Sequence, residues 1–251
     1  DWTKVADVET DYSAYGIKAN NKTTIVVDSN KTNPGKNGTI TIKAKTLWSP
    51  SGDSGSKYTA AHGIAVGNFS QRFNKKVSED LVKTTINADV VIEELRGGSI
   101  KTTGISSMDC SDLAINGRFT IKPGAISLMQ WNRGDQSKTY GIYMIGSNNT
   151  ISITSADIDD SKNGSLSDLI KTDESLWGGK TEKNVLRIGG GTLKVKENQK
   201  ERYLISAAKG FRTFINVNQD GSAIGISKAD LQGTIRMDAG SEAYGGLTAG
   251  S

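Results

Sequence analysis

Short segments in which apolar and polar residues alternate recur along most of the chain, and they constrain its fold more than any other feature of the sequence. Each segment begins with a small or polar residue, usually Thr, and then alternates apolar with polar residues. Alternation with a period of two residues is typical of β-strands that bury one face and expose the other. The segments lie at residues 24–28, 39–43, 118–122, 150–154, 192–196, 213–217 and 234–238.

A second pattern, an aromatic residue followed by Gly and Ile or a close variant of this triplet, precedes several of these segments. Its Ile stands eight to ten residues before the next segment, as from Ile17 to Ile25 and from Ile205 to Ile215. The intervals from 151 to 193 and from 193 to 235 are both 42 residues, which predicts two coils of about 21 residues each. The triplet occurs at residues 15–17, 62–64, 140–142, 203–205 and 244–246.

Recurring strands of this kind favour an all-β fold, the right-handed parallel β-helix or β-solenoid, in which successive coils stack and pair their backbones. Each coil buries only a narrow strip, which suits a chain with 35% hydrophobic residues and 29 Gly. An antiparallel sandwich would also produce alternating strands, but it does not explain why the triplet recurs ahead of them. We therefore expect one β-helical segment over residues 1–251.

Two stretches break the repeat and are expected to be short loop or helical insertions. Residues 69–83 mix charged with apolar positions and contain few turn formers, which suggests a short helix or a long loop. Residues 157–183 are expected to include a short helix over 165–177. Insertions in repeat proteins emerge on one side and often carry the binding site. The apolar residues with helical spacing in the second stretch are Leu166, Leu169, Ile170 and Trp177.

The charges give little indication of a partner. The 31 basic and 27 acidic residues are mixed along the chain, and a net charge of +4 does not by itself indicate nucleic acid or a membrane. No apolar run approaches the roughly 20 residues that cross a bilayer, so we expect no membrane insertion by this segment. The lone Cys110 excludes an internal disulfide framework, and the first residue, Asp1, suggests a processed or trimmed N-terminus.

One motif has the form of a protease site. Residues 52–56, Gly-Asp-Ser-Gly-Ser, and residues 59–62, Thr-Ala-Ala-His, are similar to the sequences around the Ser and His of chymotrypsin-like serine proteases. In that family the His comes first and long segments separate the two, whereas here the order is reversed within 11 residues, 52–62. His62 also occupies the aromatic position of the triplet. We therefore expect an ordinary turn at 52–56 and assign no catalytic residue.

A second motif has the form of a calcium loop. Asp159, Ser161, Asn163 and Gly164 match the first half of an EF-hand loop, whose oxygen ligands alternate along the chain. The twelfth position, which should hold a bidentate acid, is Ile170. We therefore assign no metal ligand and no cofactor, and whether the stretch from Asp159 to Asn163 binds calcium stays open.

Pairs of carboxylates could hydrolyse sugar chains if they faced one groove, as they do in many glycosidases. This possibility keeps a polysaccharide-degrading β-helix, either a lyase or a glycoside hydrolase, as the enzymatic alternative. The candidate pairs are Glu93 with Glu94, Asp157 with Asp159 and Asp160, and Asp109 with Asp112.

Basic and aromatic residues suggest a surface that binds a carbohydrate or another acidic polymer. Lys194 and Lys196 lie two positions apart in an expected strand, so they should point to the same outer side. The other candidates lie in the two expected insertions, where a Trp could stack on a sugar. The residues assigned to ligand binding are Arg72, Lys75, Lys76, Trp177, Lys194 and Lys196.

The coil patterns quoted above, over most of residues 12–250, resemble the passenger domains of bacterial autotransporters, the proteins of type V secretion. The similarity is greatest to the adhesin and self-association class. The resemblance implies export across the inner and outer membranes to the bacterial cell surface or into the medium. It also implies adhesion or biofilm formation without catalysis, with a host surface glycan, a matrix protein or another copy of the chain as partner.

Overall fold

The structure is a computed structural model in which the described residues form 21 strands and no helix. The chain is therefore all-β, as predicted. The described residues are 3–10, 14–19, 25–27, 38–46, 60–67, 81–97, 101–128, 138–146, 148–173, 185–196, 202–207, 212–215, 223–226, 229–237 and 242–244.

These strands form two sheets, one of 14 strands and one of seven, and every strand pair recorded in the described residues is parallel. The larger sheet contains β1 (Thr3–Thr10), β3 (Ile25–Val27), β4 (Gly38–Thr46), β6 (Val82–Ile86), β7 (Ala88–Gly97), β9 (Ser111–Ile121), β10 (Ile126–Leu128), β12 (Thr150–Asp160), β14 (Val185–Ile188), β15 (Gly191–Val195), β17 (Arg212–Ile215), β18 (Ala223–Ile226), β19 (Ala229–Gln232) and β21 (Glu242–Tyr244). The seven-stranded sheet contains β2 (Ala14–Ala19), β5 (Ala61–Gly67), β8 (Lys101–Met108), β11 (Lys138–Ile145), β13 (Asp168–Asp173), β16 (Tyr203–Ala207) and β20 (Ile235–Met237).

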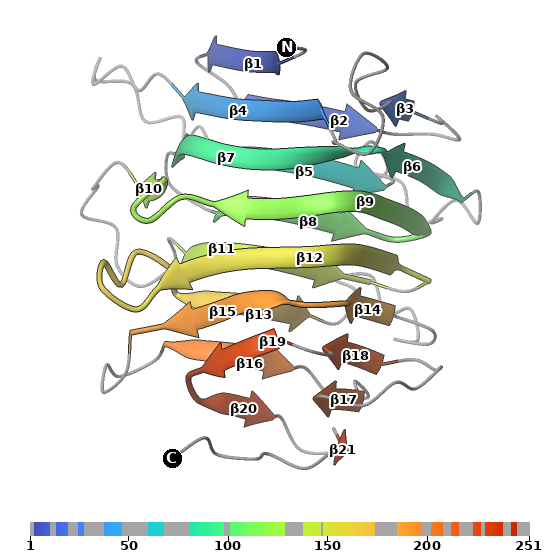
Figure 1. The fold of residues 1–251 in the computed structure, drawn as a ribbon, viewed down its shortest axis with the longest axis vertical. Coiled ribbons are helices and arrows are strands. Elements are labelled where there is room, and N and C mark those ends of the chain that lie inside the picture. The colour runs from blue at the N-terminus through green and yellow to red at the C-terminus, as the bar shows by residue number, and fades with distance from the viewer. Residues whose placement is uncertain are drawn as a thin grey trace, which may run out of the picture.

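The chain passes repeatedly from one sheet to the other, so the molecule is solenoid-like. In Figure 1 the two sheets lie one behind the other, with the N-terminal strands at the top and the C-terminal strands at the bottom. β4 is followed by β5, β7 by β8, and β12 by β13, each on the opposite sheet. The core is the apolar layer enclosed between the two sheets.

One column of isoleucines runs through all strands of the seven-stranded sheet. Each member pairs in register with the next, and the five from Ile64 to Ile205 are fully buried. This column confirms that the triplets at 15–17, 62–64, 140–142 and 203–205 are one structural position. The triplet at 244–246 was wrongly included, because Tyr244 pairs with Phe214 in the larger sheet. The column consists of Ile17, Ile64, Ile105, Ile142, Ile170, Ile205 and Ile235.

The coils are longer than the predicted 21 residues. The isoleucines at 17, 64, 105, 142, 170, 205 and 235 are 47, 41, 37, 28, 35 and 30 residues apart. The reason is that one coil contributes two alternating segments to the larger sheet. β9 spans 11 residues and pairs with both β6 and β7. The predicted 42-residue interval also connected residues that are not equivalent. Leu193 pairs with Ile158 in the larger sheet, whereas Ile235 belongs to the seven-stranded sheet.

In the first four strands of the seven-stranded sheet, the glycine before the isoleucine is required by a close approach between coils. A Cβ built on Gly104 would lie 2.6 Å from the carbonyl oxygen of Gly141 and 2.7 Å from a methyl carbon of the core residue Ile121. Real Cβ atoms essentially never come that close to another heavy atom, so a side chain here would force the strands apart. The position points into the core, and so does the isoleucine that follows it. In later coils Leu169 and Leu204 fill this position and are buried.

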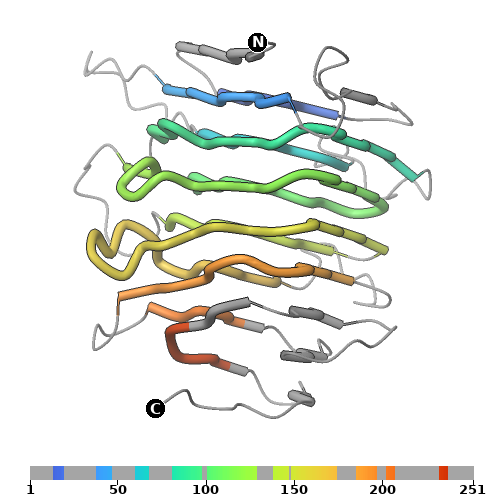
Figure 2. Tube along the Cα trace, viewed as in Figure 1, coloured from blue at the N-terminus to red at the C-terminus, as the bar shows by residue number. Residues whose placement is uncertain are grey.

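Most of the second predicted insertion belongs to the coil. β12 extends to Asp160, a turn follows, and β13 adds a strand to the seven-stranded sheet (Figure 2). The predicted helix over 165–177 is therefore wrong for residues 168–173. Leu169 and Ile170 both face the core because they occupy the Gly and Ile positions of the triplet, and this produced the apparently helical spacing. Residues 69–80 and 174–183 lie outside the described residues, and β6 already begins at Val82.

Replacing Gly104 with Ala should destabilise the protein by about 1 to 3 kcal/mol, the range for overpacking a well-packed core. The added methyl group would meet the Gly141 carbonyl oxygen at 2.6 Å. Urea unfolding followed by circular dichroism measures the change. Ser152→Ala, on the half-exposed side of β12, is the control and should change stability by less than about 0.5 kcal/mol. Equal stability of Gly104→Ala and wild type would contradict the close approach.

Candidate functional site

The described ligand-binding candidates, Lys194 and Lys196, lie at the end of β15. Leu193 and Val195 are buried in the core, so the two lysines point to the outer side as predicted. Lys194 pairs in register with Asp159. A Cβ on Gly164 would lie 3.0 Å from the Lys196 Cδ, which places Lys196 over the turn after β12. Arg72, Lys75, Lys76 and Trp177 lie outside the described residues.

The turn after β12, the predicted half of a calcium loop, is closed by its own hydrogen bonds. Asp159 Oδ1 accepts from the Ser161 amide at 3.0 Å and the Ser161 hydroxyl at 2.5 Å, and these bonds are the main reason that its pKa is lowered. Buried Asp160 accepts from the Ser165 amide at 2.8 Å and the Leu166 amide at 2.7 Å. Within the described parts of the chain, no group of three or more His, Cys, Asp and Glu side chains is placed to hold a metal ion.

The acidic residues on the outer face of the larger sheet pair with basic residues of neighbouring coils. Glu93 lies between Lys43, at 3.6 Å, and Lys122, and the hydrogen bond from Lys122 is the main cause of its lowered pKa. The same arrangement repeats at Lys45 with Glu94, 3.1 Å apart, and at Arg118 with Asp157, 3.3 Å apart. Exposed pairs of this kind contribute little stability, but they neutralise the charge of this face.

The outer face of the seven-stranded sheet is different. Because the Gly and Ile positions of each strand both face the core, the residue before them and the residue after them both lie on the other side of the sheet, where Tyr140 and Tyr143 form a second buried cluster with Met108 and Ile145. The residues at these flanking positions form two rows across the coils. We call these two rows, together with Lys101, Lys138 and Asp173, the tyrosine–lysine face. The first row is Tyr15, His62, Thr103, Tyr140, Asp168 and Tyr203; the second is Lys18, Ala65, Ser106, Tyr143, Lys171, Ser206 and Arg236.

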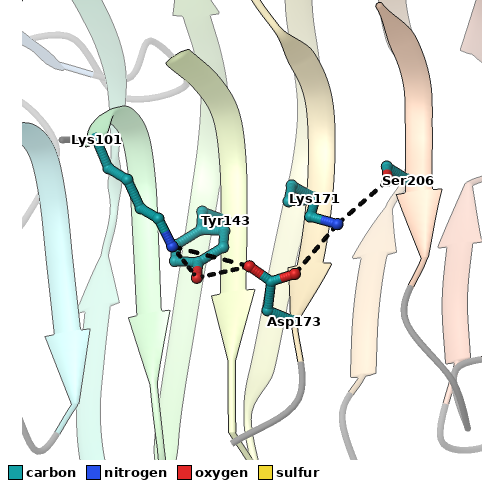
Figure 3. A network of polar contacts seen from close by, with 5 residues as sticks. All are labelled: Lys101, Tyr143, Lys171, Asp173 and Ser206. Carbon is teal, nitrogen blue, oxygen red and sulfur yellow. Dashed lines mark hydrogen bonds and ion pairs between the residues drawn. The ribbon is translucent and has the colours of Figure 1, made fainter. Parts of the chain in front are cut away.

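A polar network crosses the middle of this face (Figure 3). Lys101 Nζ donates to the Tyr143 hydroxyl at 2.6 Å, and that hydroxyl donates to Asp173 Oδ2 at 2.9 Å. Lys171 Nζ lies 3.1 Å from Asp173 Oδ1 and donates to the Ser206 hydroxyl at 3.3 Å. The network therefore joins four consecutive strands, β8, β11, β13 and β16, and two lysines share one carboxylate.

Cations and aromatic rings lie against one another along the same face. Lys18 Nζ is 4.4 Å from the ring centre of Tyr15, and that ring stacks on His62 with a centroid distance of 5.2 Å. Lys101 Nζ is 4.3 Å from the centre of the Tyr143 ring. The Arg236 guanidinium lies 5.7 Å from the centre of the Tyr203 ring. These distances are within the range of cation–π attraction.

Asp168 is the unusual titratable group of the face. Its residue is 8% exposed, it stands between Tyr140 and Tyr203 in the first row, and its Oδ1 atom has no hydrogen-bond partner. Burial raises its pKa to about 6, against the attraction of Lys171 and Lys138. Burial also raises the pKa of Tyr140, helped by the charges of Asp173 and Asp168. The carboxyl therefore changes charge close to neutral pH in the midst of several cations.

No sequence motif marks this face. Tyr15, His62, Tyr140 and Tyr203 entered only as marks of the repeat. Aligning residues 101–108, 138–145 and 168–173 on their isoleucines would have placed Lys101 beside Lys138, Tyr140 beside Asp168 and Tyr143 beside Lys171. That alignment needs the true coil lengths, which are irregular.

The chain matches no protein-family model, no curated protein and no solved structure. The described residues contain no helix long and apolar enough to cross a membrane.

Asp168 should make the protein less stable as the pH rises from about 4 to above 6. Its pKa is about 6 in the folded state and 3.8 ordinarily, so between these values the folded state binds more protons and loses stability with rising pH. Asp168→Asn lacks this penalty. Relative to wild type, its free energy of unfolding should rise by on the order of 2 to 3 kcal/mol between about pH 4 and about pH 7.5. Urea unfolding at several pH values measures it.

Asp159→Asn is the matched control for this series. The pKa of Asp159 is lowered in the folded state, so its contribution is present at neutral pH and lost in acid. The control should therefore be less stable than wild type at about pH 7.5 and approach it as the pH falls. A difference in stability between Asp168→Asn and wild type that is the same at every pH would contradict the raised pKa of Asp168.

Tyr143→Phe and Asp173→Asn should have non-additive effects on stability, because the Tyr143 hydroxyl donates to the Asp173 carboxylate at 2.9 Å. Each single variant should lose about 1 kcal/mol, and the double variant should lose less than the sum by at least about 0.5 kcal/mol. Thermal or urea unfolding of the four proteins gives the coupling energy. The control pair, Tyr143→Phe with Glu94→Gln on the other sheet, should be additive; coupling of equal size there would argue against a specific network.

Proposed function

We propose that this chain is a segment of an exported right-handed parallel β-helix of the autotransporter passenger type, which binds through its outer faces and catalyses no reaction. The in-register isoleucine column and the alternation between two parallel sheets support a β-helix. Right-handedness is supported by the strong general preference of parallel crossover connections for that hand. The segment lies at the bacterial cell surface or in the medium after transport across the outer membrane.

The contrast in charge between the two outer faces is the observation that carries the binding function. On the larger sheet, Glu93, Glu94 and Asp157 each have a basic partner in a neighbouring coil. The described part of the tyrosine–lysine face has five cations and only two carboxylates, interleaved with aromatic rings. Such a concentrated excess of one charge attracts an oppositely charged partner. The residues are Lys18, Lys101, Lys138, Lys171 and Arg236 against Asp168 and Asp173.

The partner is a surface molecule of the host or of a bacterium. A glycan or a matrix protein would bring acidic groups to the cations of this face. Another copy of the chain on a second cell would instead bring its own exposed residues, which gives self-association. These partners fit the adhesin and self-association class that the coil patterns resemble.

The spacing of the two carboxylates on this face favours binding over hydrolysis. Asp168 and Asp173 are five positions apart on β13, which corresponds to roughly 16 Å along a strand. The two carboxyl groups of a glycosidase stand about 5 to 9.5 Å apart. The carboxylates of the larger sheet take part in ion pairs, as described above.

A polysaccharide-degrading enzyme is the second candidate, and two observations favour it. The Tyr143 hydroxyl lies between the Lys101 ammonium and the Asp173 carboxylate, at 2.6 and 2.9 Å. A hydroxyl placed between a base and an acid can relay a proton. Asp168, with a pKa of about 6, has the raised value typical of a general acid.

The test compares binding and product release in the same incubations. The purified chain should be retained on some members of an array of glycans and matrix proteins, or should aggregate cells that display it, and no oligosaccharide should be released. Lys18→Gln combined with Arg236→Gln should weaken binding several-fold, because both side chains are exposed on the tyrosine–lysine face. Circular dichroism verifies that the variant is folded.

Lys43→Gln combined with Lys122→Gln is the matched control, because it removes the same charge from the larger sheet. Equal loss of binding in the two variants would show that binding depends only on the net charge of the chain, and would contradict the proposed face. Release of oligosaccharides that Tyr143→Phe abolishes would replace binding with the enzymatic function.

A further inference from the structure

The spacing of charges on the tyrosine–lysine face indicates which acidic partner it fits. Neighbouring parallel strands lie about 4.8 Å apart. Lys18 on β2, Lys171 on β13 and Arg236 on β20 lie in one row, four strands and two strands apart, and the Lys101 ammonium reaches the same row at the Tyr143 hydroxyl. A chain lying across the strands along this row therefore meets a cation about every 5 to 15 Å. Single-stranded nucleic acid, with one charge about every 3.4 Å, is more densely charged than this.

The groups between the cations suit sugar hydroxyls. Asp173, whose side chain is 33% exposed, can accept hydrogen bonds from hydroxyl groups. Lys101 and Lys171, with side chains 32% and 19% exposed, can donate to hydroxyl or carboxylate oxygens. The half-exposed Tyr15 and Tyr203 offer aromatic surface at the two ends of the face. A sparsely charged polymer rich in hydroxyls matches this pattern.

Asp168 lies where its charge opposes such a ligand. It is surrounded by Tyr140 and Lys138 on β11, by Lys171 on its own strand, and by groups of the two following coils. Those groups are Tyr203 on β16 and Arg236 on β20. When Asp168 is ionised it cancels part of the positive charge of this cluster, and when it is neutral the cluster is more cationic.

We propose that the tyrosine–lysine face binds a carboxylated polysaccharide that lies across the strands along the stacking axis, and that Asp168 weakens this binding when it is ionised. The inference rests on the proposed binding function and names the ligand class for that same face. Polygalacturonate, a polymer of uronic acid, is the probe. Its methyl ester, which keeps the hydroxyls and loses the charge, is the matched control ligand.

Binding to immobilised polygalacturonate should be measured by biolayer interferometry at about pH 7.5 and about pH 5. We expect measurable binding to the acid and at least tenfold weaker binding to the ester. Lys18→Gln combined with Arg236→Gln should weaken binding to the acid several-fold, and Lys43→Gln combined with Lys122→Gln should not. Raising the salt concentration should weaken binding in proportion to the number of ion pairs formed.

The effect of pH is measured in variants that lack His62, because a histidine on the same face also gains charge as the pH falls. In a His62→Gln background, binding should be about two to tenfold tighter at pH 5 than at pH 7.5, the effect of one charge at a distance of about 10 Å near a protein surface. Asp168→Asn in the same background should bind equally at both pH values. A pH effect that survives Asp168→Asn would overturn the role of Asp168.

Other results separate this inference from the proposed function. Equal affinity for the acid and the ester, or tighter binding to single-stranded DNA than to polygalacturonate, would overturn the ligand class. If the chain binds a neutral glycan or aggregates cells but does not bind polygalacturonate, the binding function stands and this inference fails. If it binds nothing in either experiment, both fail.

Discussion

Parallel pairing of equivalent strands in register is the interaction on which the rest of this structure depends. It places each side chain directly beside the equivalent side chain of the next coil, about 4.8 Å away. In the core this produces an uninterrupted apolar ladder, in which Ile64, Ile105, Ile142 and Ile170 are fully buried. On the outside the same geometry places similar side chains beside one another wherever the sequence repeats, and adjacent side chains of like charge destabilise a sheet.

The two outer faces meet this constraint in different ways. The larger sheet alternates the sign of charge from coil to coil, as in the order Lys43, Glu93 and Lys122. In the second row of the seven-stranded sheet uncharged residues separate the cations, so that Tyr143 stands between Ser106 and Lys171, whereas Lys101 and Lys138 pair directly. The first arrangement gives a balanced face and the second leaves positive charge in excess. The net charge of +4 for the whole chain reveals neither.

The sequence was sufficient to predict the all-β class, the parallel stacking and the equivalence of Tyr15, His62, Tyr140 and Tyr203. It was not sufficient for the coil length, because one coil holds two alternating segments and the connections differ in length. The helix predicted over 165–177 failed because consecutive inward residues at Leu169 and Ile170 have a spacing that also suits a helix. The network around Tyr143 joins residues from 101 to 206, and only the register brings these residues together.

The unequal coils have a consequence for how such a protein changes over time. The isoleucines at 17 and 64 are 47 residues apart and those at 142 and 170 only 28, yet all four stand in one column. The pairing of strands therefore tolerates a large gain or loss of residues between them. A lineage can lengthen one connection and leave the neighbouring coils in place. The connecting loops and the stacked strands can then evolve at separate rates, and an altered loop does not require a new fold.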